Sequence, residues 1–358
     1  MNEFDFIRQL REHVRSRKTS ARVISGIGDD AAVIRQTHDR DLVISTDLLV
    51  ENIDFHSEAT PPRLLGHKAL AVSLSDIAAM GARPLWSLVS MGLPKNVWNS
   101  DYKDEVFSGY LALADRYSMT LTGGDVSESQ QIVIDSIVVG EVRAGRAVLR
   151  STARPGDQIF VTGSLGGAAA GLKLIERGAR VRSPSVSEGN ESRQDADGRR
   201  QDAADNQVSV SDDEAIQALL LRQLAPQPRV GWGIVLGEEQ LATAMIDISD
   251  GLSSDLHHLC TESKVGATID SASLPLDENV KHLCGRRALD PLALALHGGE
   301  DFELLFTVAP ENISRLPKRV DGVPISHIGE ITTNQEVRVR EKNRLWDLPA
   351  EGFQHFSD

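Results

Sequence analysis

The sequence predicts a mixed α/β protein built from two domains. Its 358 residues exceed the roughly 250–300 at which one hydrophobic core usually stops growing. Apolar runs with the two-residue period of strands alternate along the chain with runs that have the helical period. Apolar residues make up 41% of the chain, which is enough to fill a core in each domain.

The first domain is expected to occupy residues 1–150. Its predicted elements, in chain order, are a helix at 4–17, a strand at 41–50, a long helix at 62–81 and strands at 119–125 and 132–142. Gly81 is expected to end the long helix. Gly123-Gly124-Asp125 is expected to form a turn after its strand.

The second domain is expected to occupy residues 151–358. Residues 153–178 and 242–263 each predict a strand, a turn and a helix, and 296–309 predicts a Gly-Gly-Glu-Asp loop that leads into a strand. Residues 183–213 contain eight acidic residues, three arginines and no aromatic residue, a composition typical of a disordered insertion.

Charge and cysteine content narrow the class of protein. The formal net charge is −14, which argues against nucleic-acid binding because that needs Lys and Arg to neutralise phosphates. The two cysteines, Cys260 and Cys284, cannot build a disulfide framework, so we expect a cytoplasmic location. The charged N-terminal segment is unlike a signal peptide, and the apolar runs are far shorter than the ~20 residues of a membrane span.

Carboxylates occur where α/β sheets place their ligand sites, at strand ends and beside glycines. The candidates are Asp29, Asp30, Asp47, Asp125, Asp247, Asp250, Glu300 and Asp301. An aspartate after glycine is also a common turn residue, so each motif alone is weak. We expect Asp30 to matter more than Asp29, which could simply shape the turn.

Asp76 is harder to explain as a turn residue, because it lies in the small-residue helix "ALAVSLSDIAAM". A carboxylate buried there is costly unless it is paired or bound to a metal. Lys68 lies eight residues earlier on the same face, so a structural Lys68–Asp76 pair is the alternative.

The aspartates as a group favour Mg²⁺, because this ion prefers oxygen ligands and binds through carboxylates and substrate phosphates. Glycine-rich loops near them predict several Mg²⁺ ions that bridge the protein to a nucleoside triphosphate. No G-x-x-x-x-G-K-[ST] motif is present, which excludes the P-loop proteins.

Seven motifs together carry a resemblance that covers the chain outside 183–213. They are "GIGDDAAV", "ISTDLLVENIDF", "GHKALAVSLSDIAAMGARP", "LTGGD", "AMIDISDGLSSDL", "GGEDFEL" and "GFQHF", in this order. The sequence resembles the thiamine-monophosphate kinase family, which belongs to a superfamily with aminoimidazole ribonucleotide synthetase and selenophosphate synthetase.

The resemblance implies a fold and a reaction. The fold would be the two-domain aminoimidazole ribonucleotide synthetase-like fold, with an N-terminal domain that forms an intersubunit β-barrel in a homodimer and a C-terminal α+β domain. The enzyme would be a phosphotransferase that moves the γ-phosphoryl group of ATP to thiamine monophosphate and gives thiamine diphosphate. Its substrates are expected to be its partners, with no nucleic acid and no membrane.

Site residues follow from the resemblance, motif by motif. The Mg²⁺ ligands would be Asp30, Ser45, Thr46, Asp47, Asp76, Asp125, Asp247 and Asp250, among which Asp30, Asp76, Asp125 and Asp247 would be catalytic. Gly124, Asp125, Arg150 and Ser249 would contact ATP. Asp54, Glu300 and Phe353 would bind thiamine monophosphate, with Phe353 stacked on a ring of the substrate.

Departures from the family pattern leave alternatives open. The family often has His at the position of Asp54, and the stretch 183–213 is longer than the usual connection. Another ATP-using enzyme of the superfamily, such as a purine-pathway cyclase, is the nearest alternative. A protein that binds Mg²⁺ and nucleotide without turnover is the alternative from another class.

Overall fold

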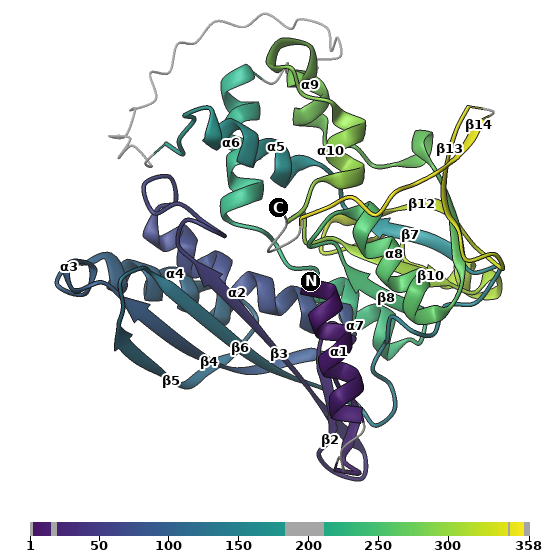
Figure 1. The fold of residues 1–358 in the computed structure, drawn as a ribbon, viewed down its shortest axis with the longest axis horizontal. Coiled ribbons are helices and arrows are strands. Elements are labelled where there is room, and N and C mark those ends of the chain that lie inside the picture. The colour runs from purple at the N-terminus through teal and green to yellow at the C-terminus, as the bar shows by residue number, and fades with distance from the viewer. Residues whose placement is uncertain (1–2, 16–19, 183–210, 343, 354–358) are drawn as a thin grey trace, which may run out of the picture.

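The computed structural model describes residues 3–15, 20–182, 211–342 and 344–353. These residues form two β-sheets with helices packed on them (Figure 1), as the alternating periodicities predict. Among the described residues, no helix combines the length and the apolar character that crossing a membrane requires.

The first sheet has six strands in the order β1-β2-β3-β6-β4-β5. They are β1 (Val23–Ser25), β2 (Ala32–Arg35), β3 (Arg40–Val50), β4 (Arg83–Leu93), β5 (Thr120–Glu128) and β6 (Val133–Arg143). β3, β6 and β4 are antiparallel neighbours, whereas β5 pairs parallel to β4 at the edge of the sheet. The strands expected at 41–50 and 132–142 are therefore confirmed.

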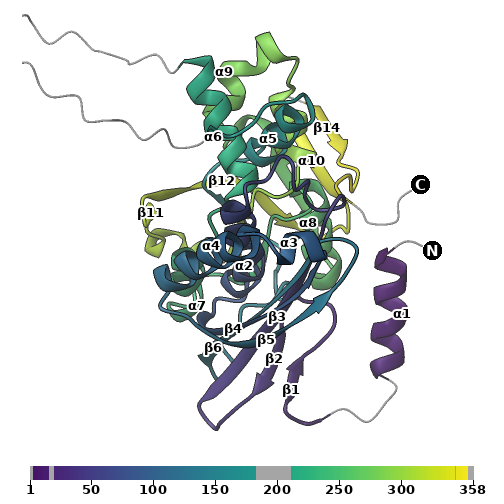
Figure 2. The same cartoon turned by 90° about the vertical axis from the view of Figure 1, so that its left-hand side faces the viewer.

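One face of this sheet carries α2 (Pro62–Ala79) and α4 (Tyr102–Arg116), while α1 (Glu3–Arg15) stands on its other side (Figure 2). The short α3 (Lys95–Trp98) precedes α4. Gly66 of α2 and Gly109 of α4 bring the two helices into close contact. A Cβ atom at either glycine would lie 1.8 Å from a carbonyl oxygen of the other helix, on Val106 or Arg63.

The second sheet has the strand order β14-β13-β9-β12-β7-β10-β8, and β11 pairs with β12. Its strands are β7 (Gln158–Thr162), β8 (Ala244–Asp247), β9 (Gly266–Asp270), β10 (Leu304–Val308), β11 (Arg319–Val320), β12 (Val323–Thr332), β13 (Val337–Glu341) and β14 (Arg344–Asp347). The helices of this half are α5 (Gly167–Glu176), α6 (Asp212–Leu224), α7 (Val230–Glu238), α8 (Leu252–Ser263), α9 (Glu278–Arg287) and α10 (Pro291–His297).

The two sheets share a hydrophobic core. Phe160, Trp232 and Phe306 of the second half belong to the same buried cluster as Leu70 and Leu74 of α2. The rings of Phe160 and Phe306 stack with centroids 5.7 Å apart. The elements of the two halves are therefore packed against one another, and residue 150 remains our proposed domain boundary.

The turn expected at Gly123-Gly124-Asp125 is wrong, because β5 continues through these residues to Glu128. Gly124 is needed for close packing in the sheet: a Cβ atom there would lie 1.8 Å from the carbonyl oxygen of Val89 on β4. The glycine pair therefore marks a close approach of two backbones, which sequence alone does not separate from a turn.

The expected insertion at 183–213 falls mostly outside the described residues, which omit 183–210. Its last three residues, however, begin a helix. Ser211 is the N-cap of α6, where its Oγ accepts from the N–H of Glu214 and the Glu214 side chain accepts from the Ser211 N–H. This capping box stabilises the start of α6.

Candidate active site

The loop between β1 and β2 places two neighbouring carboxylates in different surroundings. Asp29 Oδ1 accepts from the backbone N–H groups of Asp30 and Arg150, so Asp29 holds the turn together. Asp30 Oδ1 accepts from Arg150 Nη2 at 2.6 Å. Burial and the neighbouring Asp30 raise the pKa of Asp29 to about 7, against the opposing effect of Arg150.

Asp30, Asp76 and Asp247 form a carboxylate cluster. One oxygen of each lies within 4.8 Å of the others, although they come from a loop, from α2 and from the end of β8. Ser45 Oγ donates to Asp76, and Ser75 Oγ donates to Asp247 at 2.6 Å. The strand ends and the helix converge here because α2 packs against both β3 and β8.

The cluster holds more negative charge than its surroundings neutralise. Burial first, then Asp47, Asp247 and Asp30, raise the pKa of Asp76 well above its ordinary value. Burial and Asp30 likewise raise the pKa of Asp247. Burial together with Asp135 and Asp30 raises the pKa of Asp47 to about 6, although hydrogen bonds with Ser73 and Asp76 oppose the shift.

Two buried carboxylate oxygens in this region, Asp30 Oδ2 and Asp47 Oδ2, have no hydrogen-bond partner among the described residues. Leaving such an oxygen without a partner is costly. A cation among carboxylates would satisfy both oxygens and relieve the repulsion that raises the pKa values. The donor set is made of oxygen atoms, which suits a hard divalent cation such as Mg²⁺.

Lys68 does not form the alternative pair with Asp76. Its side chain is 1% exposed, and its Nζ lies 2.6 Å from Oε1 of Glu300. Asp76 instead accepts from Ser45 Oγ in the carboxylate cluster. The helix therefore carries two separate polar positions on one face, one directed at the aspartates and one at the loop that contains Glu300.

A cavity of about 350 Å³ lies beside the cluster. Its lining brings together residues with three expected roles. Asp54, Glu300 and Phe353 are expected to bind the acceptor, Ser249 the nucleotide, and Asp47 and Asp250 the metal. Ile53, Val72, Leu172 and Phe302 supply apolar wall, and Phe353 is 50% exposed. Asp47, a candidate metal ligand, lines this cavity together with Lys68 and Glu300. The cavity therefore extends from the neighbourhood of the carboxylate cluster to the Glu300 loop.

Glu300 is held by contacts of both its side chain and its backbone. Lys68 Nζ contacts one carboxylate oxygen and Gln223 Nε2 donates to the other. Its backbone N–H donates to the carbonyl oxygen of Ser249 at 2.7 Å, and its φ of 64° lies in the left-handed region. A non-glycine residue in that region is strained. The fold thus fixes this carboxylate at the cavity wall.

Asp54 is fixed by the turn after β3. Its Oδ2 accepts from the N–H of Val50 at 2.7 Å, and its own N–H donates to the carbonyl oxygen of Val50. An aspartate at this position therefore closes the turn and lines the cavity at the same time.

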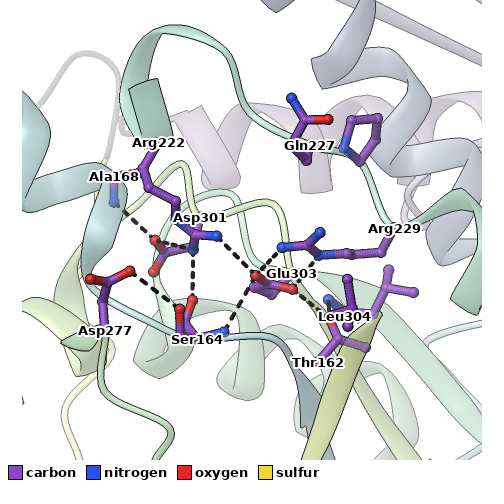
Figure 3. Close-up of polar contacts among 12 residues, drawn as sticks. Thr162, Ser164, Ala168, Arg222, Gln227, Arg229, Asp277, Asp301, Glu303 and Leu304 are labelled. Carbon is purple, nitrogen blue, oxygen red and sulfur yellow. Dashed lines mark hydrogen bonds and ion pairs between the residues drawn. The ribbon is translucent and has the colours of Figure 1, made fainter. Parts of the chain in front are cut away.

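The sequence reasoning missed a buried charge network under the Glu300 loop (Figure 3). Glu303 and Asp301 are buried, and Arg222 and Arg229 surround them. Arg229 donates two hydrogen bonds to Glu303, and Thr162 Oγ1 donates to it at 2.7 Å. Burial would raise the pKa of Glu303, yet Arg229 and Arg222 hold that pKa below its ordinary value.

Asp301 stabilises the start of α5 from the same network. Its carboxylate accepts from the N–H groups of Gly166 at 2.6 Å and Ala168 at 3.1 Å. Carboxylates at a helix N-terminus are favourable there. Acidic residues that follow Gly-Gly are a signal for a ligand site, and nothing in the motif separates Glu300, which faces the cavity, from Asp301 and Glu303, which hold the scaffold.

Three expected site residues stay apart from the carboxylate cluster. Thr46 lies on the opposite face of β3 from Ser45, and its Oγ1 donates to Asp135 at 2.6 Å. Gly124 and Asp125 lie on β5, the edge strand. The register runs from Asp47 through β6 and β4 to Gly124, so three strand spacings of about 4.8 Å separate them.

The chain matches two family models. Residues 28–142 match the AIR synthase related protein, N-terminal domain, and residues 154–342 match the AIR synthase related protein, C-terminal domain. The chain is also similar to thiamine-monophosphate kinases. It is 35% identical to that of Escherichia coli K12 over 99% of this chain and 98% of the relative, and 34% identical to that of Bacillus subtilis over 99% and 100%.

Solved structures are similar to this chain along most of its length. A structure of AaThiL complexed with AMPPCP and TMP superposes with a TM-score of 0.79 at 30% identity, and covers 99% of this chain and 97% of that one. The HypE–HypF complex, at 16% identity and a TM-score of 0.65 over 95% of this chain and 98% of that one, shares the fold.

Proposed function

The chain belongs to the thiamine-monophosphate kinase family of AIR synthase related proteins, and we propose on this basis how it acts. It transfers the γ-phosphoryl group of ATP to thiamine monophosphate and gives thiamine diphosphate. The observation that carries this function is similarity to the kinases along 99% of the chain, and it is supported by a cavity whose lining includes Asp47, a neighbour of the carboxylate cluster.

The cavity is the proposed site for thiamine monophosphate. Glu300 and Asp54 place carboxylates at its wall, which suits the cationic thiazolium ring, and Phe353 offers a ring for stacking. The acceptor phosphate then lies towards Asp47 and the carboxylate cluster. Gln223 and Lys68 hold Glu300, so we assign them a supporting role in substrate binding.

The proposed metal is Mg²⁺, bound by the aspartates of the cluster. Asp30, Asp47, Asp76 and Asp247 lie together, with Ser45 and Asp250 close to them in the site. Asp125 and Thr46 are proposed ligands from other parts of the sheet. Bound Mg²⁺ would neutralise charge on the two phosphorylated reactants, which otherwise repel each other.

This chain's own residues supply alignment more than covalent chemistry. The nucleophile is a phosphate oxygen, which is largely ionised at pH 7 because the second pKa of a phosphomonoester is about 6. No strong general base is needed. Arg150, buried beside Asp30, is the proposed contact for the phosphates of ATP, with Gly124, Asp125 and Ser249 as further nucleotide contacts.

The function is tested by incubating the purified chain with ATP, Mg²⁺ and thiamine monophosphate and separating the thiamine phosphates. We expect thiamine diphosphate to form in proportion to ADP, and chelation of the metal to stop the reaction. ATP binding without product would contradict the proposal and favour a non-catalytic binding protein.

We further propose that the chain is a homodimer in which the open face of the first sheet meets its copy. That face exposes Leu48 and Trp86, with 57% and 39% of each residue accessible. Light scattering should give the mass of two chains for the wild type and of one for Trp86→Glu. Trp98→Glu, at an exposed tryptophan on α3, is the matched control and should remain a dimer. A cytoplasmic location stays a prediction.

A further inference from the structure

Arg11 links the N-terminal helix α1 to α8 in the other half of the chain. Its guanidinium makes two hydrogen bonds to the carboxylate of Glu262, one of them 2.8 Å long from Nη2 to Oε2. Both side chains are 24% exposed, so the pair is mostly shielded from water. α1 is therefore attached beside the site by a two-point ion pair.

The same guanidinium lies on the glycine-rich loop. A Cβ atom at Gly28 would lie 2.4 Å from Cζ of Arg11, and the φ of 117° at Gly28 also favours glycine. Asp30, two residues on, belongs to the carboxylate cluster. Arg11 thus covers the loop that carries this candidate metal ligand. Because the guanidinium occupies the space of a side chain at position 28, only glycine fits there.

Arg11 also lies near Arg150, although two guanidinium groups repel. The pKa of Arg11 is raised by its hydrogen bond to Glu262 and by Asp29, while Arg150 lowers it. The Nε atoms of Arg11 and Arg150 are both buried and have no hydrogen-bond partner among the described residues. Arg150 Nε lies 3.6 Å from Asp29 Oδ1, which is too far for a hydrogen bond. An acceptor with several oxygens would satisfy both N–H groups.

We propose that Arg11 is a nucleotide-binding residue, whose guanidinium acts with Arg150 on the phosphate chain of ATP, so that α1 completes the ATP site. This inference rests on the proposed function and adds a residue to it. Phosphate oxygens fit the forked donors of arginine, and the fork leaves Nε free when Glu262 holds the two terminal nitrogens. Asp30 would then face the bound cation, and the two guanidinium groups would face the phosphates.

The test compares Arg11→Met with Arg8→Met. Both replace an arginine of α1, but Arg8 is 67% exposed and pairs with Asp5, so its variant is the matched control. Calorimetry measures the Kd of AMPPCP with Mg²⁺ present, and steady-state kinetics measure KM for ATP and for thiamine monophosphate. Arg11→Met should raise the Kd for AMPPCP and the KM for ATP about 10- to 100-fold. The KM for thiamine monophosphate should change less than about twofold, and Arg8→Met should resemble the wild type.

The outcomes separate a binding role from a purely structural one. If Arg11→Met binds AMPPCP as the wild type does, or raises both KM values by one common factor, Arg11 merely attaches α1 and the inference is wrong. If Arg11→Met does not fold, Arg11→Lys takes its place, because lysine keeps the charge and loses the forked donors of the guanidinium. A smaller rise in the Kd for AMPPCP is then expected. A wild type that binds AMPPCP but makes no thiamine diphosphate would contradict the proposed function and leave this test readable.

Discussion

Replacing Glu303 with Gln should destabilise the second half of the chain because it unbalances a buried charge network. In the wild type, the carboxylates of Asp301 and Glu303 balance the guanidinium groups of Arg222 and Arg229. Glu303 is 0% exposed, and the side chains of Arg229 and Arg222 are 12% and 23% exposed. The variant keeps the hydrogen-bonding shape but leaves a buried positive charge.

The expected cost follows from these contacts. Removing one partner of a buried ion pair typically costs about 3–5 kcal/mol, and Gln can still accept from one arginine, so we expect about 3 kcal/mol. For a unit of about 200 residues this lowers the Tm by roughly 6–12 °C. The Glu300 loop shares this network through Asp301, so the KM for thiamine monophosphate should also rise.

The dependence on pH gives a second check. The pKa of Glu303 in the folded chain lies below its ordinary value of 4.5, so ionised Glu303 contributes stability above that pH. The difference between wild type and variant should shrink once the pH falls below about 4.5 and through the folded pKa of Glu303, because wild-type Glu303 then becomes neutral too.

Thermal and urea unfolding, followed by circular dichroism, measure the effect. Glu278→Gln is the control, because that side chain is 85% exposed and pairs with Lys281 at the surface. It should change the stability by less than about 0.5 kcal/mol. If Glu303→Gln unfolds within that same margin of the wild type, the network contributes no net stability and the reasoning from buried charge fails.

Three further changes test the site. Asp76→Asn should lower the rate of thiamine diphosphate formation by several orders of magnitude. In EDTA the variant should keep or raise the Tm, because it removes repulsion in the metal-free cluster, and a fall in that Tm would contradict this. Gly124→Ala should distort β5 and lower the Tm, because its Cβ would meet the Val89 oxygen, whereas Gly123→Ala, whose Cβ would have its nearest neighbour at 3.9 Å, should be mild. Mg²⁺ affinity, followed by calorimetry, should weaken as the pH falls from 7.5 to 5.5, because protons compete for carboxylates such as Asp47, with a pKa of about 6. A flat profile would mean that these carboxylates do not bind the ion.

The sequence predicted the parts of the fold that depend on local pattern. Periodicity placed β3, α2 and β6, and the two-domain resemblance is confirmed by the family models. Asp76 was recognised from the cost of a carboxylate in an apolar helix, and the structure places it in the cluster. Gly124 was misread because a turn and a close backbone contact require the same residue.

The residues that sequence could not find act through contacts across the chain. Lys68 and Glu300 are 232 positions apart, and Arg11 and Glu262 are 251 apart, so no spacing rule connects them. Arg222 and Arg229 resemble ordinary helix-end arginines until Glu303 is placed between them. Asp125 shows that a motif can also suggest a contact that the fold does not make. Its motif predicted a site shared with Asp47, and the sheet places it three strands away.

Helix α2 sets the distance between two parts of the site. Asp76 reaches the cluster at one point of it and Lys68 reaches Glu300 eight residues earlier, so a rise of 1.5 Å per residue separates the two positions by about 12 Å. Its contact with α4 through Gly66 and Gly109 leaves the helix little freedom to bend or slide. In the proposed site, this spacing fixes the distance from phosphoryl transfer to ring recognition, so we expect the enzyme to select an acceptor by its length as well as by its charge.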